Sequence, residues 1–159
     1  MATSTIIQKL YGLDEAAVAP SVGQDNATQS ARCSIQRFRT SGAVAVGETV
    51  RFDVTAADSQ RVMVVNQCTA GGAGGNRFAV GVALEAAAAG GTDFINVIVG
   101  GYAEDAICVA GAQSGDILGC VTAAGELEAM AGPDIRGAVG VALENEAGGF
   151  VDLWIFQKV

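Results

Sequence analysis

The side chains best suited to acid–base chemistry in this chain are pairs of carboxylates. The pairs are Glu104 with Asp105, Glu126 with Glu128, and Glu144 with Glu146. A spacing of two, as in the second and third pairs, puts both acids on one face of a strand. A glycosidase needs a pair of carboxylates placed in a cleft. Saccharide sites often add aromatic platforms, but the polar-tipped rings Tyr11, Tyr102 and Trp154 are scattered. We therefore expect the acids to be solvated turn residues.

Other catalytic patterns are missing from the sequence. The chain has no His, so it lacks the commonest general base and cannot build a Ser-His-Asp or Cys-His site alone. Ser114 lies in Gly-Ala-Gln-Ser-Gly, which is not the G-x-S-x-G elbow. The glycines of segment 71–75 precede Arg77 rather than a Lys-Ser/Thr pair, which predicts a flexible loop and no nucleotide site. The prediction is a protein that is not an enzyme and needs no cofactor.

The four cysteines are Cys33, Cys68, Cys108 and Cys120, and none of them form a CxxC pair. Zinc sites usually combine close Cys pairs with His or further Cys, so we predict no metal site and buried free thiols. The N-terminus has no basic region followed by an apolar stretch, and no apolar run approaches the roughly 18 residues that span a bilayer. We expect synthesis in a reducing cytoplasm and no membrane partner.

The formal net charge is −8, which argues against nucleic acid as a partner. Residues 32–61 nevertheless carry five Arg against three acids. This cationic segment is either ordinary surface charge or a docking segment for an acidic partner, such as a neighbouring subunit. For the second case the predicted contact residues, with their apolar anchors, are Arg32, Ile35, Arg37, Phe38 and Arg39.

An internal repeat organises the rest of the chain. The segment 79–85, Ala-Val-Gly-Val-Ala-Leu-Glu, recurs at 138–144, and both copies lead through Gly-Gly to a bulky apolar segment. Upstream, 47–50 matches 115–118 and 54–57 matches 121–124. Each copy is a few strands that cannot bury both faces alone. We predict an all-β fold, a small β-barrel or jelly-roll-like sandwich built from an internal duplication. It comprises a body at 43–159, with halves at about 43–100 and 109–156, and an extended N-terminal arm at 1–42.

The segment 150–156 has two apolar faces. Val151, Leu153 and Ile155 point one way, and Phe150, Asp152, Trp154 and Phe156 point the other. A strand of this kind is normally covered on both sides. We predict that Phe150, Trp154 and Phe156 form an oligomer interface, with a loop or the arm of the same chain as the alternative cover.

The order of these blocks resembles the capsid decoration, or cement, proteins of tailed bacteriophages. Segment 111–118 is similar to the A-G-x-x-x-G-D-x-L turn of that family, and 121–125 is similar to the strand and turn that follow it. The resemblance covers about residues 42–159 and leaves the arm unmatched. It implies a β-rich body, often a homotrimer, that binds the outer surface of an icosahedral head. The long loop at 71–75 and the four cysteines depart from the pattern.

The function expected from this resemblance is that of a structural virion protein. Its partners would be copies of itself and the major capsid protein. It would be made in the cytoplasm of a bacterial host and located on the outer capsid surface. The alternative is a receptor- or glycan-binding virion module of the fibre type, against which the scarcity of aromatic residues in loops argues.

Overall fold

The fold is all-β in the part of the chain that the structure describes. The computed structural model describes residues 33–57, 60–88 and 93–156. Its strands are β1 (Cys33–Thr40), β2 (Thr49–Phe52), β3 (Val64–Gln67), β4 (Ala79–Ala83), β5 (Phe94–Ile107), β6 (Ile117–Gly119), β7 (Glu128–Ala129), β8 (Ala138–Ala142) and β9 (Phe150–Ile155). A single 3-10 turn, η2 (Gly72–Gly74), lies between β3 and β4. The residues from Ser34 onward group as one compact unit, the body.

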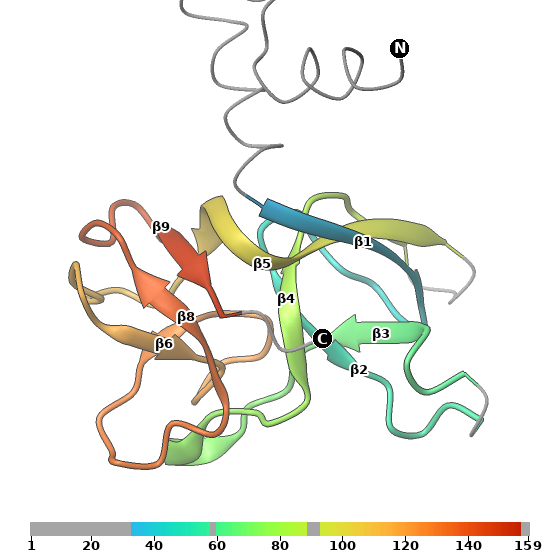
Figure 1. Cartoon of the computed structure of the whole chain (residues 1–159), viewed down its shortest axis with the longest axis horizontal. Coiled ribbons are helices and arrows are strands. Elements are labelled where there is room, and N and C mark those ends of the chain that lie inside the picture. Colours follow the sequence, from blue (N-terminus) through green and yellow to red (C-terminus); the bar gives the residue numbers. More distant parts are fainter. Residues whose placement is uncertain (1–32, 58–59, 89–92, 157–159) are drawn as a thin grey trace, which may run out of the picture. The chain divides into compact units, whose positions relative to one another are not determined.

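Five strands close a small barrel. The strand order is β1-β3-β2-β4-β5, and a further pairing between β1 and β5 joins the two ends. Figure 1 shows the ring, with β1 and β5 above, β3 and β2 below, and β4 running between β5 and β2. Closure removes the free sheet edges that a sandwich would leave. Of the two predicted architectures, the barrel is therefore the one the chain adopts.

The first strand lies where the arm was predicted. Residues 33–40 form β1, which pairs in parallel with β3 through Arg39 and Val64. Phe38 and Thr40 on this strand are buried. The segment that closes the barrel is thus part of the predicted arm 1–42. The remainder of that arm, including Arg32, lies outside the described residues.

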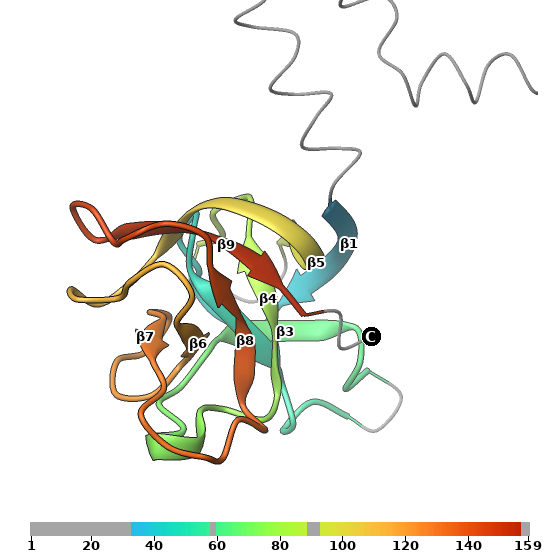
Figure 2. The ribbon, with the colours of Figure 1, turned by 60° about the vertical axis from the view of Figure 1, so that its left-hand side comes forward.

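The other four strands extend the sheet beyond the barrel in the order β9-β8-β6-β7. They join it through the second half of β5, which pairs with β9 from Gly101 to Ile107. Figure 2 shows β5 curving from the barrel to lie beside β9. The ladder is interrupted between Ala103 and Ala106, where Asp105 adopts a positive φ of 51°. β5 serves both halves by pairing with β4 at Val97 and Ile98 and with β9 from Gly101 onward. The irregularity is a bulge within the second of these ladders.

The two halves share their strand register, as a duplication requires. In the first half, Val50 of β2 pairs with Gly81 of β4, and a shift follows before the next pair. In the second half, Leu118 of β6 pairs with Gly140 of β8, and a shift follows at the same place. Ala83 of β4 pairs with Val97 of β5, and its repeat counterpart Ala142 of β8 pairs with Leu153 of β9. Val97 and Leu153 are therefore equivalent positions. The repeated sequence blocks therefore occupy repeated places in the sheet.

Each half contributes inward-facing apolar side chains to the core. The barrel core contains Phe38, Val44, Val50, Val65, Val80, Ala83, Ala87, Ile95, Val97 and Val99. The equivalent positions of the second half are also buried, namely Leu118, Val139, Ala142, Val151, Leu153 and Ile155. Fully burying a side chain of this size is worth about 1.5–3 kcal/mol, so both halves supply the apolar burial that holds the sheet together.

The glycine-rich loop joins the two halves by backbone contacts. Gly137 donates a hydrogen bond from its backbone N–H to the carbonyl oxygen of Gly74 at 2.9 Å, and Gly75 pairs with Gly137 as a short parallel bridge. A Cβ atom on Gly75 would lie 2.7 Å from the carbonyl oxygen of Gly137. Two backbones approach this closely only because neither residue has a side chain. The loop predicted to be flexible is therefore a paired connection between the halves.

Candidate interaction surface

The outer face of β9 carries large aromatic side chains in the open. Trp154 and Phe150 are 44% and 45% exposed, whereas Leu153 and Ile155 on the opposite face are 0% and 1% exposed. The strand thus has the two apolar faces that the sequence indicates, and the body covers one of them. Single exposed hydrophobic residues are normal on protein surfaces, but a cluster of rings is not.

The strands on either side extend this apolar surface. Trp154 pairs with Tyr102 of β5 on one side and with Val141 of β8 on the other. Paired residues of neighbouring strands point to the same face of a sheet. Leu143 follows β8 and is exposed. Its backbone N–H donates a hydrogen bond to the carbonyl oxygen of Asp152 in β9 at 2.8 Å. We call the set Tyr102, Val141, Leu143, Phe150, Trp154 and Phe156 the β9 face.

The duplication supplies an internal reference for the β9 face. The register makes Ile98 of β5 the first-half counterpart of Trp154, and Val82 the counterpart of Val141. Ile98 is 4% exposed and Val82 is 1% exposed, compared with 44% for Trp154. Ile98 and Val82 are therefore covered in the first half, whereas Trp154 is open in the second. The margins of this surface are exposed in both halves, since Leu84 and Phe94 are 39% and 54% exposed and their counterparts Leu143 and Phe150 are 46% and 45% exposed. Trp154, the exposed residue, is also larger than its covered counterpart Ile98. Exposure to water would instead favour a smaller or more polar side chain at that position.

A polar contact fixes the centre of the β9 face. The hydroxyl of Tyr102 donates a hydrogen bond to the carboxylate of Asp152. The other oxygen of that carboxylate accepts from the backbone N–H of Asp105 at 3.1 Å. Burial, followed by the hydrogen bond to Asp152, raises the pKa of Tyr102 above its usual range. The ring is therefore held as a neutral donor beside Trp154, which gives the surface a defined shape.

A second surface lies on the first strand. The guanidinium of Arg37 lies 5.5 Å from the centre of the Phe94 ring, and Phe94 is 54% exposed. Ile35 is two residues from Arg37 on the same strand and is also exposed. A cation stacked on an exposed ring is a common feature of recognition surfaces. We call Ile35, Arg37 and Phe94 the β1 patch.

The predicted contact residues around Arg37 have different positions. Arg39 is exposed on β1, whereas Phe38 is 4% exposed and packs edge-on against Phe52, with 6.1 Å between ring centres. Phe38 is therefore a core residue of the barrel and not a surface anchor, because alternate residues of β1 point inward. Arg32 lies outside the described residues. The contact roles of Arg32, Ile35, Arg37 and Arg39 stay predictions.

Sequence reasoning missed Phe94 as a surface residue. The register places Phe94 at the position equivalent to Phe150, and both rings are about half exposed. The repeat could have revealed this, since Phe150 was already assigned to an outer face. What the repeat could not reveal is that β1 brings Arg37 to Phe94, because that contact depends on barrel closure.

The carboxylates serve turns and loop contacts. Glu146 accepts hydrogen bonds from the backbone N–H groups of Gly149 at 2.7 Å and Gly111 at 3.2 Å, and these bonds lower its pKa. Glu128 accepts from the Thr122 hydroxyl at 2.5 Å. Within the described ranges, no group of three or more Cys, Asp or Glu side chains is arranged to hold a metal ion.

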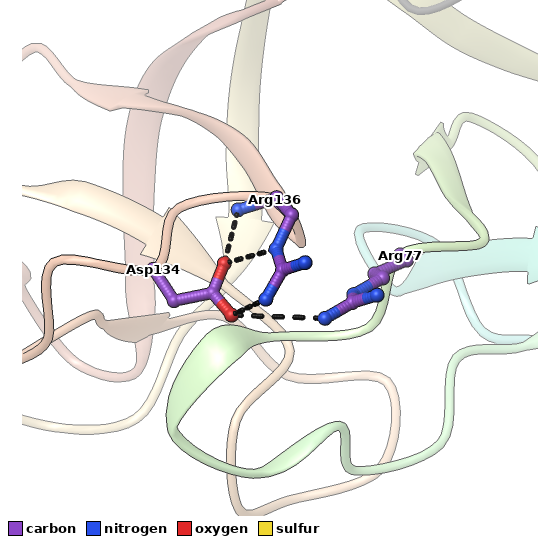
Figure 3. A network of polar contacts seen from close by, with 3 residues as sticks. All are labelled: Arg77, Asp134 and Arg136. Atoms are coloured by element: carbon purple, nitrogen blue, oxygen red, sulfur yellow. Dashed lines mark hydrogen bonds and ion pairs between the residues drawn. The ribbon is translucent and has the colours of Figure 1, made fainter.

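An ion cluster lies where the two halves meet, beside the glycine-rich loop. Asp134 accepts from the Arg136 side chain at 2.7 and 2.5 Å, and Arg77 lies 3.7 Å from the same carboxylate (Figure 3). Hydrogen bonding to Arg136 holds the pKa of Asp134 well below its usual range. All three groups are substantially exposed, so the cluster orients the loops more than it stabilises them.

Among the described residues, no helix is long and apolar enough to cross a bilayer. Sequence comparisons add no relative: no protein family model matches the chain, and no curated protein matches it. A solved structure does match, that of the N base of head fiber gp8.5 of bacteriophage phi29. The TM-score is 0.53 at 17% identity, and the match covers 78% of this chain and 94% of that one. At this identity the likeness is one of fold.

Proposed function

We propose that this chain is a structural protein of a bacteriophage head, a capsid decoration (cement) protein that binds the outer surface of the shell. In this proposal the chain forms a homotrimer and contacts the major capsid protein. The observation that carries it is the open β9 face, with Trp154 exposed where its counterpart Ile98 is covered. The phi29 head fiber base supports the same assignment, since its fold is similar and it is part of a phage head fiber.

The two surfaces suit different contacts. The β9 face is apolar around one satisfied polar pair, as the centre of a subunit interface usually is. The β1 patch combines the cation of Arg37 with two exposed apolar side chains, Ile35 and Phe94, which suits a partner surface that carries acids. We assign the β9 face to self-association and the β1 patch to the shell.

Co-sedimentation with heads assembled without this chain tests the proposal. The full chain is expected to pellet with heads and to saturate at a fixed number of copies per head. Arg37→Glu is expected to weaken binding at least tenfold, because it reverses the charge of the patch and removes the contact with Phe94. Arg61→Glu makes the same charge change outside the patch and is expected to bind normally. A chain that never pellets with heads would contradict the proposal.

The fibre-type alternative is favoured by one observation, the match to a head fiber base over 94% of that structure. A fibre base would bind the head in the same assay but at few sites, and its distal part would bind a receptor or glycan. Counting copies per head, together with binding to an array of host-surface glycans, separates the two. Dense occupancy without glycan binding supports decoration, and sparse occupancy with glycan binding supports the alternative.

A further inference from the structure

Two buried cysteines from different halves of the body contact one another. Cys68 follows β3 and Cys120 follows β6, and neither side chain is accessible to solvent. The Cys120 thiol lies 3.6 Å from the carbonyl oxygen of Cys68, a residue 52 positions away. The two side chains also hydrogen bond to each other. Two thiols in contact are the starting geometry for a disulfide.

Backbone hydrogen bonds hold both cysteines in place. The carbonyl oxygen of Cys68 accepts from the N–H of Gly125 at 2.7 Å, and that of Cys120 accepts from the N–H of Gly71 at 3.0 Å. Gly71 and Gly125 belong to the loops that link the halves, so the two chain segments are tied on both sides of the thiol pair. These bonds keep the backbones of the two cysteines side by side.

The environments of the buried cysteines differ in a way that favours this pair. Burial and neighbouring acids raise the pKa of Cys108 to about 11. The hydrogen bond from Cys68 lowers the pKa of Cys120, with help from two backbone N–H groups. Because the thiolate is the reactive form, Cys120 is more reactive than Cys108. Each residue of the pair is followed directly by a residue at the surface, Thr69 being exposed and Val121 half-buried, so local opening of these loops would bring the thiols to an oxidant.

We propose that Cys68 and Cys120 form a disulfide linking the two halves once the protein meets a low-molecular-weight disulfide outside the reducing cytoplasm. The Cys120 thiolate attacks one sulfur of glutathione disulfide, and one glutathione thiolate leaves. The Cys68 thiolate then attacks the Cys120 sulfur of the mixed disulfide and releases the second glutathione. Two protein thiols are oxidised, one glutathione disulfide is reduced to two thiols, and two protons are passed on. The proposal is independent of the protein's role on a phage head.

The test is to incubate the folded full chain with glutathione disulfide, then denature it, alkylate free thiols and map the peptides. Cleavage after Arg61 and Arg77 and before Asp116 puts Cys68, Cys108 and Cys120 in three different peptides. We expect two thiols to be lost and one linked pair, Cys68 with Cys120. The loop closed by the bond spans 52 positions, so Tm should rise by on the order of 10 °C and fall back when dithiothreitol is added.

Cys108→Ala is the matched control and is expected to form the same bond with the same rise in Tm. Cys120→Ala is expected to form no disulfide and to show no rise in Tm. If that variant fails to fold, the reversible change of Tm in the unmodified chain still decides the matter. Four alkylated cysteines after prolonged incubation would overturn the proposal, and so would a linkage that involves Cys33 or Cys108.

Discussion

Replacing Trp154 with Ala removes the largest side chain of the β9 face and is the sharpest test of that surface. An indole side chain presents roughly 250 Å² when fully exposed, and Trp154 keeps 44% of its surface open in the single chain. About 110 Å² is therefore available for burial between subunits. At about 25 cal/mol per Å², this area is worth about 3 kcal/mol per subunit, or roughly a hundredfold in the association constant.

Sedimentation velocity over a range of concentrations measures the effect. Trp154→Ala should need roughly a hundredfold higher concentration than the unmodified chain to reach half assembly. At concentrations where both are monomers, Tm should change little, because the ring is not in the core. Phe78→Ala removes another half-exposed ring, one outside the β9 face, and should assemble normally. Identical assembly of the Trp154 and Phe78 variants would refute the reasoning.

Three further predictions concern the body itself. Gly75→Ala should lower the free energy of unfolding by about 2 kcal/mol or more in urea denaturation, since its φ is +64° and a Cβ there meets a carbonyl oxygen at 2.7 Å. Gly42→Ala, which has nothing within 4 Å, should be neutral. Because the pKa of Tyr102 is raised on folding, its contribution is present below the ordinary phenol pKa of about 10 and is lost above it. The Tm difference between the unmodified chain and Tyr102→Phe should therefore shrink at high pH, and absorbance titration should show a late-ionising phenol that the variant lacks. The pKa of Glu146 is lowered on folding, so the Tm difference from Glu146→Gln should be full at neutral pH and vanish as the pH falls below about 4. For either variant, a Tm difference from the unmodified chain that does not change with pH would contradict the stabilising role given to that residue.

The sequence predicts the second half of the body well because local patterns determine it. The alternation from Phe150 to Phe156 separates a core face from an outer face, and the structure buries Leu153 while exposing Trp154. The matching blocks at 79–85 and 138–144 anticipate β4 and β8, down to a shared register shift. Period-two burial and duplicated pairing are properties of short segments, which a single sequence contains.

The sequence predicted a barrel as one of two architectures, but it did not predict which strand closes the barrel. The pairing of β1 with β5 joins residues far apart in the chain, and no local signal marks such a contact. The alternation of Arg37, Phe38 and Arg39 is itself a strand pattern, with Phe38 inward, but the density of arginines suggested an arm. The glycine-rich loop was misjudged for a related reason, because the partner of Gly75 is Gly137 in the other half.

Image reconstruction of heads carrying the bound protein would show the position of both proposed contact surfaces at once. We expect density on the outer surface of the shell in which the five-stranded barrel is recognisable. Trp154 should be buried against a second copy, and Arg37 should face the major capsid protein. Heads incubated with saturating protein that show no added density, or bound copies whose Trp154 faces solvent, would contradict the proposal.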